Sequence, residues 1–281
     1  MTTFKEISGQ LIRTLSSDPA NPQEGQIWYN STIGVLKGYE LVADAWAAGG
    51  NLNTAKQRSG AAGTQTAALG FGGDSGTPTG ATESFNGSTW TTVPATLNTP
   101  RRNLGSLGGS GSQTAALGFG GNDPSPSHLA VTESYNGSVW TNGGNLGTAR
   151  YFLSGAGTQT AALAIGGANP TLLAATEEYN GTSWLAGGNL NTARSAGAGG
   201  GTQTAAIYMA GSAPIYNQTE LYNGTAWTNT TSMTTGKILP GGGGTQAAAY
   251  AFGGLNPSFA LVATTEEFTG AFLSTKTITT S

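Results

Sequence analysis

The apolar positions of this chain fall in short runs bounded by glycine, asparagine and threonine, and nowhere do they recur at the spacing of a helix. The run TAALGFGG at residues 114–121 is one such segment, and TESY at residues 132–135 is another. Short runs of this kind, separated by turn-forming residues, are typical of β-strands. The pattern therefore predicts an all-β chain.

The runs belong to a repeat with a period of 43 to 48 residues. GTQTAA or a close variant begins at Gly63, Gly111, Gly157, Gly201 and Gly244, and each copy leads through small apolar residues to a glycine pair or its remnant. Five copies with one plan indicate an array of supersecondary units, because a single unit of this size cannot bury its own apolar face.

Each repeat continues with Thr-Glu-x-aromatic, a turn and an aromatic residue. The motif begins at Thr82, Thr132, Thr176 and Thr219, and in the altered form TEEFTGAF at Thr265. Asn-Gly between such runs predicts a tight hairpin with a two-residue turn, since both turn positions favour positive φ. With one strand after the repeated basic residue and one through the glycine pair, each period predicts four strands.

The order of basic residue, apolar strand, Gly-Gly, aromatic residue and Trp resembles the kelch repeat, a β-propeller family of four-stranded blades. The resemblance covers residues 47–281, with Trp90, Trp140, Trp184 and Trp227 at the kelch Trp position and Phe272 in the last copy. It implies a kelch-like β-propeller.

Residues 1–46 admit two interpretations. They form either a degenerate first blade, with inner strands at 7–14 and 25–30 and a hairpin ending at Trp46, or a docking hairpin in front of a five-bladed propeller. We favour six blades. The stretch SSDPANPQEGQIWYN (residues 16–30) resembles the N-terminal part of virion proteins of marine tailed phages, including kelch-like ones.

Composition excludes much familiar chemistry. The chain has no Cys, one His and a net charge of −3, and only 9% of its residues are charged against about 25% in an ordinary domain. Thiol chemistry, zinc or copper sites, cofactor binding and a Ser-His triad lack their residues, and there is no basic surface for nucleic acid. No apolar run is long enough to predict membrane insertion.

One basic and one acidic residue recur in every repeat. In a chain so poor in charge we expect them to form structural ion pairs with each other or with strand-end backbone. They are Lys56, Arg101, Arg150, Arg194 and Lys237 with Glu83, Glu133, Glu177, Glu220 and Glu266.

The loops between the second and third strands differ in every repeat, whereas the turns on the opposite face are nearly identical. Variable loops on a repeated frame are where recognition is expected. The candidate ligand-binding residues there are His128, Asn169, Leu172, Tyr216, Asn217, Asn256 and Phe259. Packing between neighbouring loops is the alternative role for these side chains.

The phage resemblance implies a non-enzymatic virion structural protein made in the host cytoplasm. We expect a tail or fibre-associated propeller that recognises a host-surface glycan or protein and binds other virion proteins through its N-terminal segment. A capsid-surface decoration protein is the first alternative. An enzyme acting on polysaccharide is the second, although neighbouring acids such as Glu177 and Glu178 would point to opposite faces of a strand.

Overall fold

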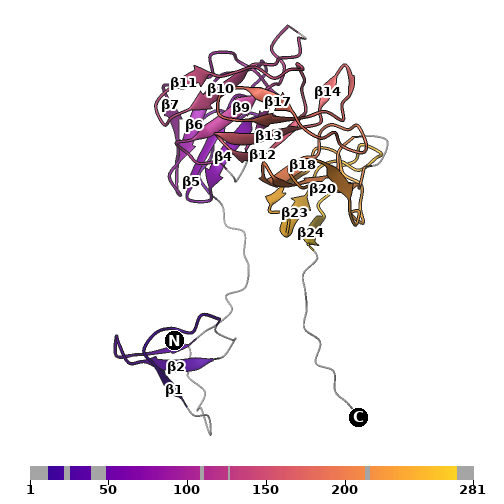
Figure 1. The fold of residues 1–281 in the computed structure, drawn as a ribbon. Helices are drawn as coiled ribbons and strands as arrows, with labels where there is room; N and C mark the ends of the chain where they lie inside the picture. The colour runs from indigo at the N-terminus through magenta and orange to yellow at the C-terminus, as the bar shows by residue number, and fades with distance from the viewer. Residues whose placement is uncertain are drawn as a thin grey trace, which may run out of the picture. The chain divides into compact units, whose positions relative to one another are not determined.

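The computed structural model describes residues 12–21, 26–38, 49–107, 111–125, 127–212 and 216–270. Every regular element among them is a β-strand, and none of the described residues forms a helix that could cross a membrane. The chain divides into two compact units, Met1–Ala48 and Gly49–Ser281. The strands form six sheets of three or four strands, plus one short hairpin (Figure 1). This confirms the predicted all-β, propeller-like fold with a shorter first sheet.

The first unit contains a three-stranded sheet in the order β1-β2-β3, formed by β1 (Arg13–Leu15), β2 (Ile27–Asn30) and β3 (Val35–Gly38). β2 and β3 are antiparallel, whereas β1 and β2 are parallel. A meander of hairpins would make every pair antiparallel, so this sheet departs from the plan of the later ones. The predicted hairpin ending at Trp46 lies outside the described residues.

Asp18 ties the first sheet together. Its carboxylate accepts hydrogen bonds from Lys37 Nζ at 2.6 Å, Asn30 Nδ2 at 2.9 Å and Trp28 Nε1 at 3.1 Å. These donors, among which Lys37 has the largest effect, lower the pKa of Asp18 to about 2. A carboxylate that accepts several hydrogen bonds is favoured in its charged form.

The second unit contains five antiparallel sheets, here called blades 1 to 5 in chain order. Blade 1 consists of β4 (Gly60–Thr64), β5 (Ala67–Phe71), β6 (Thr82–Phe85) and β7 (Trp90–Val93). Blade 2 consists of β8 (Gly105–Ser106), β9 (Ala116–Phe119), β10 (Thr132–Tyr135) and β11 (Trp140–Asn142). Blade 3 consists of β12 (Ser154–Thr158), β13 (Ala161–Ile165), β16 (Thr176–Tyr179) and β17 (Trp184–Ala186).

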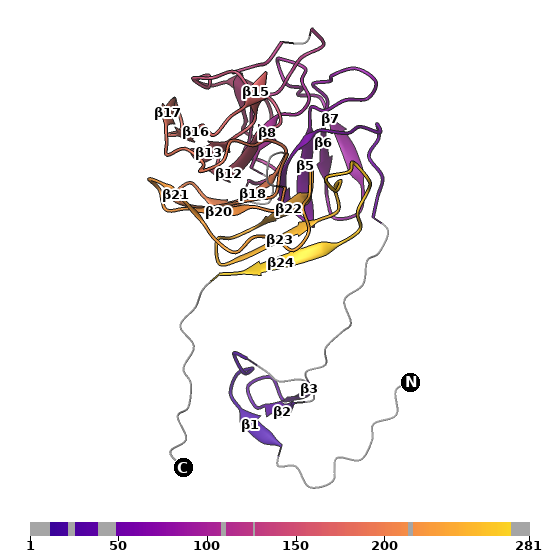
Figure 2. The ribbon, with the colours of Figure 1, turned by 90° about the vertical axis from the view of Figure 1, so that its right-hand side faces the viewer.

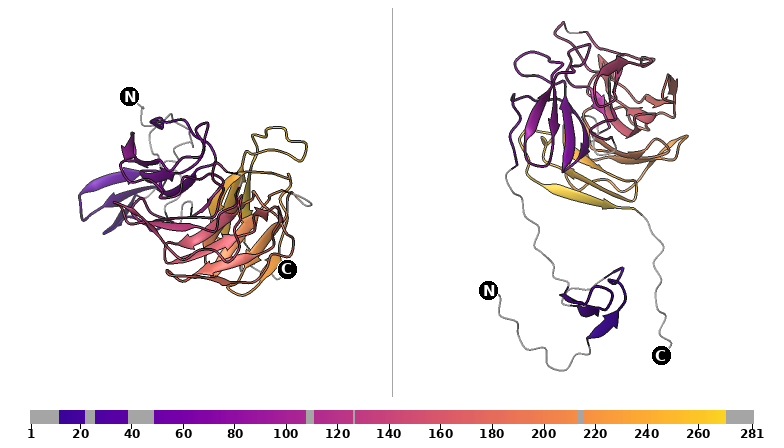
Figure 3. Two further views of the ribbon diagram at one scale, coloured as in Figure 1. Left: turned by 90° about the horizontal axis from the view of Figure 1, so that it is seen from above. Right: turned by 90° about the vertical axis from the view of Figure 1, so that its left-hand side faces the viewer.

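Blade 4 consists of β18 (Ala198–Thr202), β19 (Ala205–Met209), β20 (Thr219–Tyr222) and β21 (Trp227–Asn229). Blade 5 consists of β22 (Gly241–Gly244), β23 (Ala248–Phe252) and β24 (Thr265–Thr269), and Phe272 lies outside the described residues. A short hairpin of β14 (Ala168–Asn169) and β15 (Thr171–Leu172) stands in the variable loop of blade 3. The blades follow one another in chain order from purple to yellow (Figures 2 and 3).

The Asn-Gly hairpins form as predicted, but with a different turn. In blade 2, Tyr135 pairs with Trp140 across a loop of residues 136–139. The side-chain oxygen of Asn136 accepts the backbone N–H groups of Ser138 and Val139, both at 3.0 Å. Only the glycine, Gly137, has a positive φ (94°). Asparagine acts here through its side chain, which organises the following turn, and the two-residue turn predicted from the sequence is wrong.

Neighbouring blades are joined by a repeated pair of polar contacts. At the seam between blades 2 and 3, Gln159 Nε2 donates to the carbonyl oxygens of Ala116 and Tyr135, and Trp184 Nε1 donates to Thr132 Oγ1 at 2.9 Å. Both donors come from the later blade. The equivalent donors at other seams are Gln113, Gln203, Gln246, Trp140 and Trp227.

Four clusters of buried apolar side chains fill the seams between successive blades from 1 to 5. Phe119 lies 5.0 Å from Trp184 between ring centroids in the cluster of blades 2 and 3. Near the axis the first strands come so close that only glycine fits. A Cβ atom on Gly155, for example, would lie 2.4 Å from the carbonyl oxygen of Ser106.

Blades 5 and 1 present unpaired faces. Within the described part of the second unit, no apolar cluster joins them, and Gln65, the blade 1 counterpart of Gln159, is exposed without a hydrogen-bond partner. Tyr250 and Phe252 in β23 are 46% and 44% exposed. Their counterparts Leu163 and Ile165 in blade 3 are fully buried. The described contacts therefore run through four seams.

Candidate functional site

The candidate site is the variable face, which we define as the face carrying the five loops at residues 72–81, 120–131, 166–175, 210–218 and 253–264. The base of each loop bridges to the segment that enters the same blade, as in the pair Tyr151 and Ala168. The other four bridges are Gln57 with Asp74, Arg102 with Asn122, Ser195 with Ser212, and Ile238 with Leu255. Loops and entering segments therefore lie together at this face.

A hollow of about 160 Å³ lies at the centre of this face, between the entering segments of all five blades. Two consecutive residues from each segment line it, and the first of each pair has a φ between 53° and 58°: Arg58, Asn103, Phe152, Ala196 and Leu239. Left-handed φ is uncommon for side chains other than glycine and asparagine, and it is concentrated at structurally or functionally constrained positions.

Backbone hydrogen bonds hold these residues in place. Asn103 N donates to the Arg58 carbonyl at 3.1 Å, and Phe152 N donates to that of Asn103 at 2.9 Å. Ala196 and Leu239 continue the series, each at 2.8 Å. The backbone of each left-handed residue thus forms a hydrogen bond across a seam between blades. The side chain at the same position takes no part in this bond and differs from blade to blade.

Asn103 lines the hollow, and further polar groups of blades 1 and 2 lie next to it in the sequence or in contact with it. Asn103 is 9% exposed, and its Oδ1 atom is buried without a hydrogen-bond partner, while Nδ2 donates to Asn122 Oδ1 at 2.8 Å. Arg102 forms an ion pair with Asp74, and that hydrogen bond lowers the pKa of the Asp74 carboxyl. The polar side chains that line the hollow itself are those of Arg58, Ser59 and Asn103, and the Arg102–Asp74 pair lies outside this lining.

His128 and Asn169 are the two predicted residues that the structure brings into direct contact. His128 Nδ1 lies 2.6 Å from Asn169 Oδ1, and the imidazole stacks on Tyr151 with 4.6 Å between centroids and 17° between planes. All three side chains are half-buried. The contact crosses the seam of blades 2 and 3 and places ring surface beside an amide.

The other predicted residues make contacts within their own loops or with the segment that leads to the next blade. Leu172 is half-buried in the β14–β15 hairpin, and Tyr216 accepts the backbone N–H of Lys237 through its carbonyl oxygen. Asn217 Nδ2 donates to the Met233 carbonyl at 2.9 Å.

At the tip of the blade 5 loop, Asn256 Oδ1 accepts the N–H groups of Ser258 and Ala260, both at 2.9 Å. Phe259 is 71% exposed and Leu261 is 88% exposed. The amides of this loop and the blade 4 loop are thus occupied by backbone partners, and Phe259 is the predicted residue that stands free in solvent.

The sequence prediction missed Tyr151, Phe152, Arg58 and Asn103. Each lies one or two positions after a repeated basic residue, where side chains change from repeat to repeat although the basic residue itself recurs. That local variability was the available signal.

Four of the five repeated charge pairs form in the structure. Lys56 pairs with Glu83 at 3.4 Å, Arg101 with Glu133 at 2.8 Å, Arg150 with Glu177 at 2.6 Å, and Arg194 with Glu220. The three arginines are fully buried, and desolvation lowers the pKa of Arg101 and Arg150 although their carboxylate partners oppose it. These pairs fasten the entering segment of a blade to its third strand.

In the fifth repeat, Lys237 takes the other expected partner, strand-end backbone, and is not paired with Glu266. Lys237 Nζ donates instead to the carbonyl and hydroxyl oxygens of Thr264. Glu266 accepts the backbone N–H groups of Thr234 and Thr235 at 2.6 and 3.0 Å.

Among the described residues, no three His, Cys, Asp or Glu side chains lie close enough together to hold a metal ion. A comparison with models of known protein families finds no match, and none of the curated proteins matches the chain.

Proposed function

We propose that this protein is a non-enzymatic recognition module whose variable face binds a host-surface glycan or protein, with a glycan favoured. The observation that carries the proposal is the cluster of His128, Tyr151 and Asn169 on the variable face. Ring surfaces and a few converging polar groups are the features of small-ligand sites, and they suit the apolar faces and hydroxyl groups of a sugar.

The setting that we propose is a phage virion, with the protein at the tail or fibre and its first unit bound to other virion proteins. Two resemblances support this: the kelch-like order of residues 47–281, and the likeness of residues 16–30 to phage virion proteins. A propeller with nearly constant turns on one face and variable loops on the other can be attached by a fixed part while its loops diversify.

Binding to host cells tests the recognition. The double variant H128A/N169A removes the polar cluster, and F259S/L261S removes the two exposed apolar side chains. The matched control is V139A in an Asn-Gly turn, where Val139 is 51% exposed. We expect H128A/N169A to lower adsorption of the purified protein at least tenfold and V139A to leave it unchanged. Loss with F259S/L261S alone would favour a protein receptor, and adsorption unchanged in both variants would refute recognition by this face.

A labelled antibody against the chain, viewed on purified particles by electron microscopy, tests the setting. Label at tail or fibre tips agrees with the proposal. Label spread over the shell would instead indicate a decoration protein, and absence of label from every particle would refute the virion assignment. Release of sugar from host polysaccharide by the purified protein would overturn its non-enzymatic character.

A further inference from the structure

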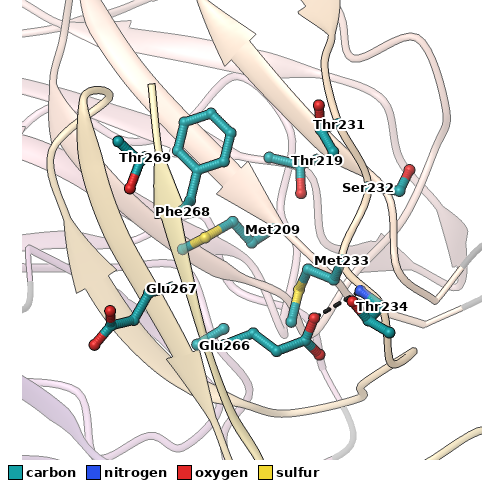
Figure 4. A pocket seen from close by; sticks show the side chains of 11 residues that line it. Met209, Thr219, Thr231, Ser232, Met233, Thr234, Glu266, Glu267, Phe268 and Thr269 are labelled. Atoms are coloured by element: carbon teal, nitrogen blue, oxygen red, sulfur yellow. Dashed lines mark hydrogen bonds between the residues drawn. The ribbon is translucent and has the colours of Figure 1, made fainter. Parts of the chain in front are cut away.

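A hollow of about 370 Å³ lies between blade 4 and blade 5. Met209, Met233 and Phe268 line it with apolar side chains, and Thr219 places a hydroxyl group there (Figure 4). Glu266 stands at its edge, where its carboxylate accepts the backbone N–H of Thr234. We call this hollow the strand slot.

The corresponding space in earlier blades holds the tryptophan of the fourth strand. Trp184 packs there between Phe119 and Tyr179, with ring centroids 5.0 and 4.9 Å away, and donates to Thr132 Oγ1. Trp227 likewise packs on Tyr222 and donates to Thr176 Oγ1 at 3.0 Å.

The repeat aligns each wall of the strand slot with a residue that touches a tryptophan. Met209 corresponds to Phe119, Thr219 to Thr132 and Phe268 to Tyr179. Met233 similarly corresponds to Leu146, which is buried in the same cluster as Trp184. The slot is therefore a tryptophan site without the tryptophan strand.

The strand beside the slot is also more exposed than its equivalents. Thr265 and Glu267 in β24 are exposed, and Glu266 and Phe268 are half-buried. In β16 of blade 3, the equivalents Thr176, Glu177 and Tyr179 are buried. β24 pairs with β23 on one side only, and an edge strand with free N–H and C=O groups is a template for another strand.

We propose that residues 271–276 of this chain dock in the strand slot as the fourth strand of blade 5, with Phe272 or Leu273 filling the tryptophan position. The segment follows Gly270 directly. Eleven residues, 271–281, follow Gly270 in the sequence, whereas the fourth strands β11, β17 and β21 contain only three residues each. Because this segment is linked to the slot by a short stretch of chain, its effective concentration there is much higher than that of a strand from another molecule.

Amide hydrogen exchange of the Thr265–Gly270 segment tests this directly. The proteins compared are the full chain, a truncation ending at Gly270, and the double variant F272S/L273S, which keeps the segment but removes its apolar side chains. T279S/T280S serves as the control because it changes the same tail beyond the docked residues. The informative amides are those of β24 that point away from β23, because the alternate ones already bond to β23. We expect these edge-facing amides to exchange at least tenfold more slowly in the full monomeric chain and the control, and to lose that protection in the other two.

Each contrary result has a clear meaning. Protection that survives truncation at Gly270 would show that a different strand fills the slot and would overturn the proposal. Protection seen only in a dimer, separated by size-exclusion chromatography, would assign the slot to a second copy. Fast exchange of β24 in the full chain would show that the tail leaves the slot open.

Discussion

Replacing Arg150 by methionine removes a buried guanidinium while keeping an apolar stem of similar length. Arg150 is fully buried, and its guanidinium donates to Glu177 Oε1 at 2.6 Å, the Ala175 carbonyl at 2.8 Å and the Gly166 carbonyl at 3.2 Å. In the R150M variant these three acceptors lose a charged donor, and a carboxylate remains inside the protein.

Breaking a buried ion pair from one side costs about 3–5 kcal/mol. Glu177 keeps two backbone donors, Gly147 N at 2.7 Å and Thr148 N at 3.3 Å, which continue to stabilise its charge. We therefore expect R150M to lose about 3 kcal/mol, or about 6–12 °C in Tm for a unit of this size. Urea and thermal unfolding followed by tryptophan fluorescence measure both quantities.

Two further variants make the test specific. R58M removes an arginine that is exposed on the variable face and should change stability by no more than about 0.5 kcal/mol. R150M/E177Q leaves an uncharged acceptor for the two backbone N–H groups and should recover part of the loss, because no unpaired charge remains buried. A loss below about 1 kcal/mol in R150M would refute the reasoning from burial.

Three other predictions concern single contacts. Q113A should lose about 1–2 kcal/mol in urea unfolding because Gln113 bridges two carbonyl groups of blade 1, whereas Q65A should be silent. Burial and the Glu178 hydrogen bond raise the pKa of Tyr222 to about 12, so its contribution to stability is complete below pH 10 and is lost as the pH rises through 12. Y222F should therefore lose less stability than the parent between pH 9 and 12. Because the pKa of Asp18 is lowered, its charged form stabilises the fold at pH values above the ordinary pKa of an aspartate, and this stabilisation is lost as the pH falls towards 2. D18N should therefore abolish the acid transition that Trp28 fluorescence reports in this pH range.

Contrary outcomes are equally specific. A cost for Q65A equal to that for Q113A would show that blades 5 and 1 are joined in solution. Identical alkaline unfolding of Y222F and the parent would exclude Tyr222 as a source of pH dependence. An unchanged acid transition in D18N would assign that transition to other carboxylates.

The repeated strands were predictable because each follows from a local pattern present in several copies. TAALGFGG gives β9, TESY gives β10, and the tryptophan begins β11, with equivalents in the other blades. The glutamine of GTQTAA is just as regular, yet its contact is with carbonyl groups of the preceding blade, more than 20 residues away. Because the glutamine makes its contacts only with a neighbouring blade, the residues next to it in the sequence do not indicate its role.

The variable face was harder to predict for the opposite reason. Its loops are unique, so no second copy shows which side chains bond within the loop and which stay free. Asn256 and Asn217 look similar to Asn169 in the sequence, but the first two bind backbone groups while Asn169 meets His128 across a seam. The parallel pairing of β1 with β2 was not predictable either, because the residues around it, including Asp18, follow a pattern that the repeats do not share.

The seam contacts have a direction, since the glutamine and tryptophan donors always belong to the later blade and the acceptors to the earlier one. A row of blades therefore has polarity, like a filament with unlike ends. Each seam contact involves only two adjacent blades and does not depend on the total number of blades. Gain or loss of one whole period would therefore leave the contacts at every remaining seam unchanged. The fifth repeat has Thr269-Gly270 at the place where the other four have Asn-Gly.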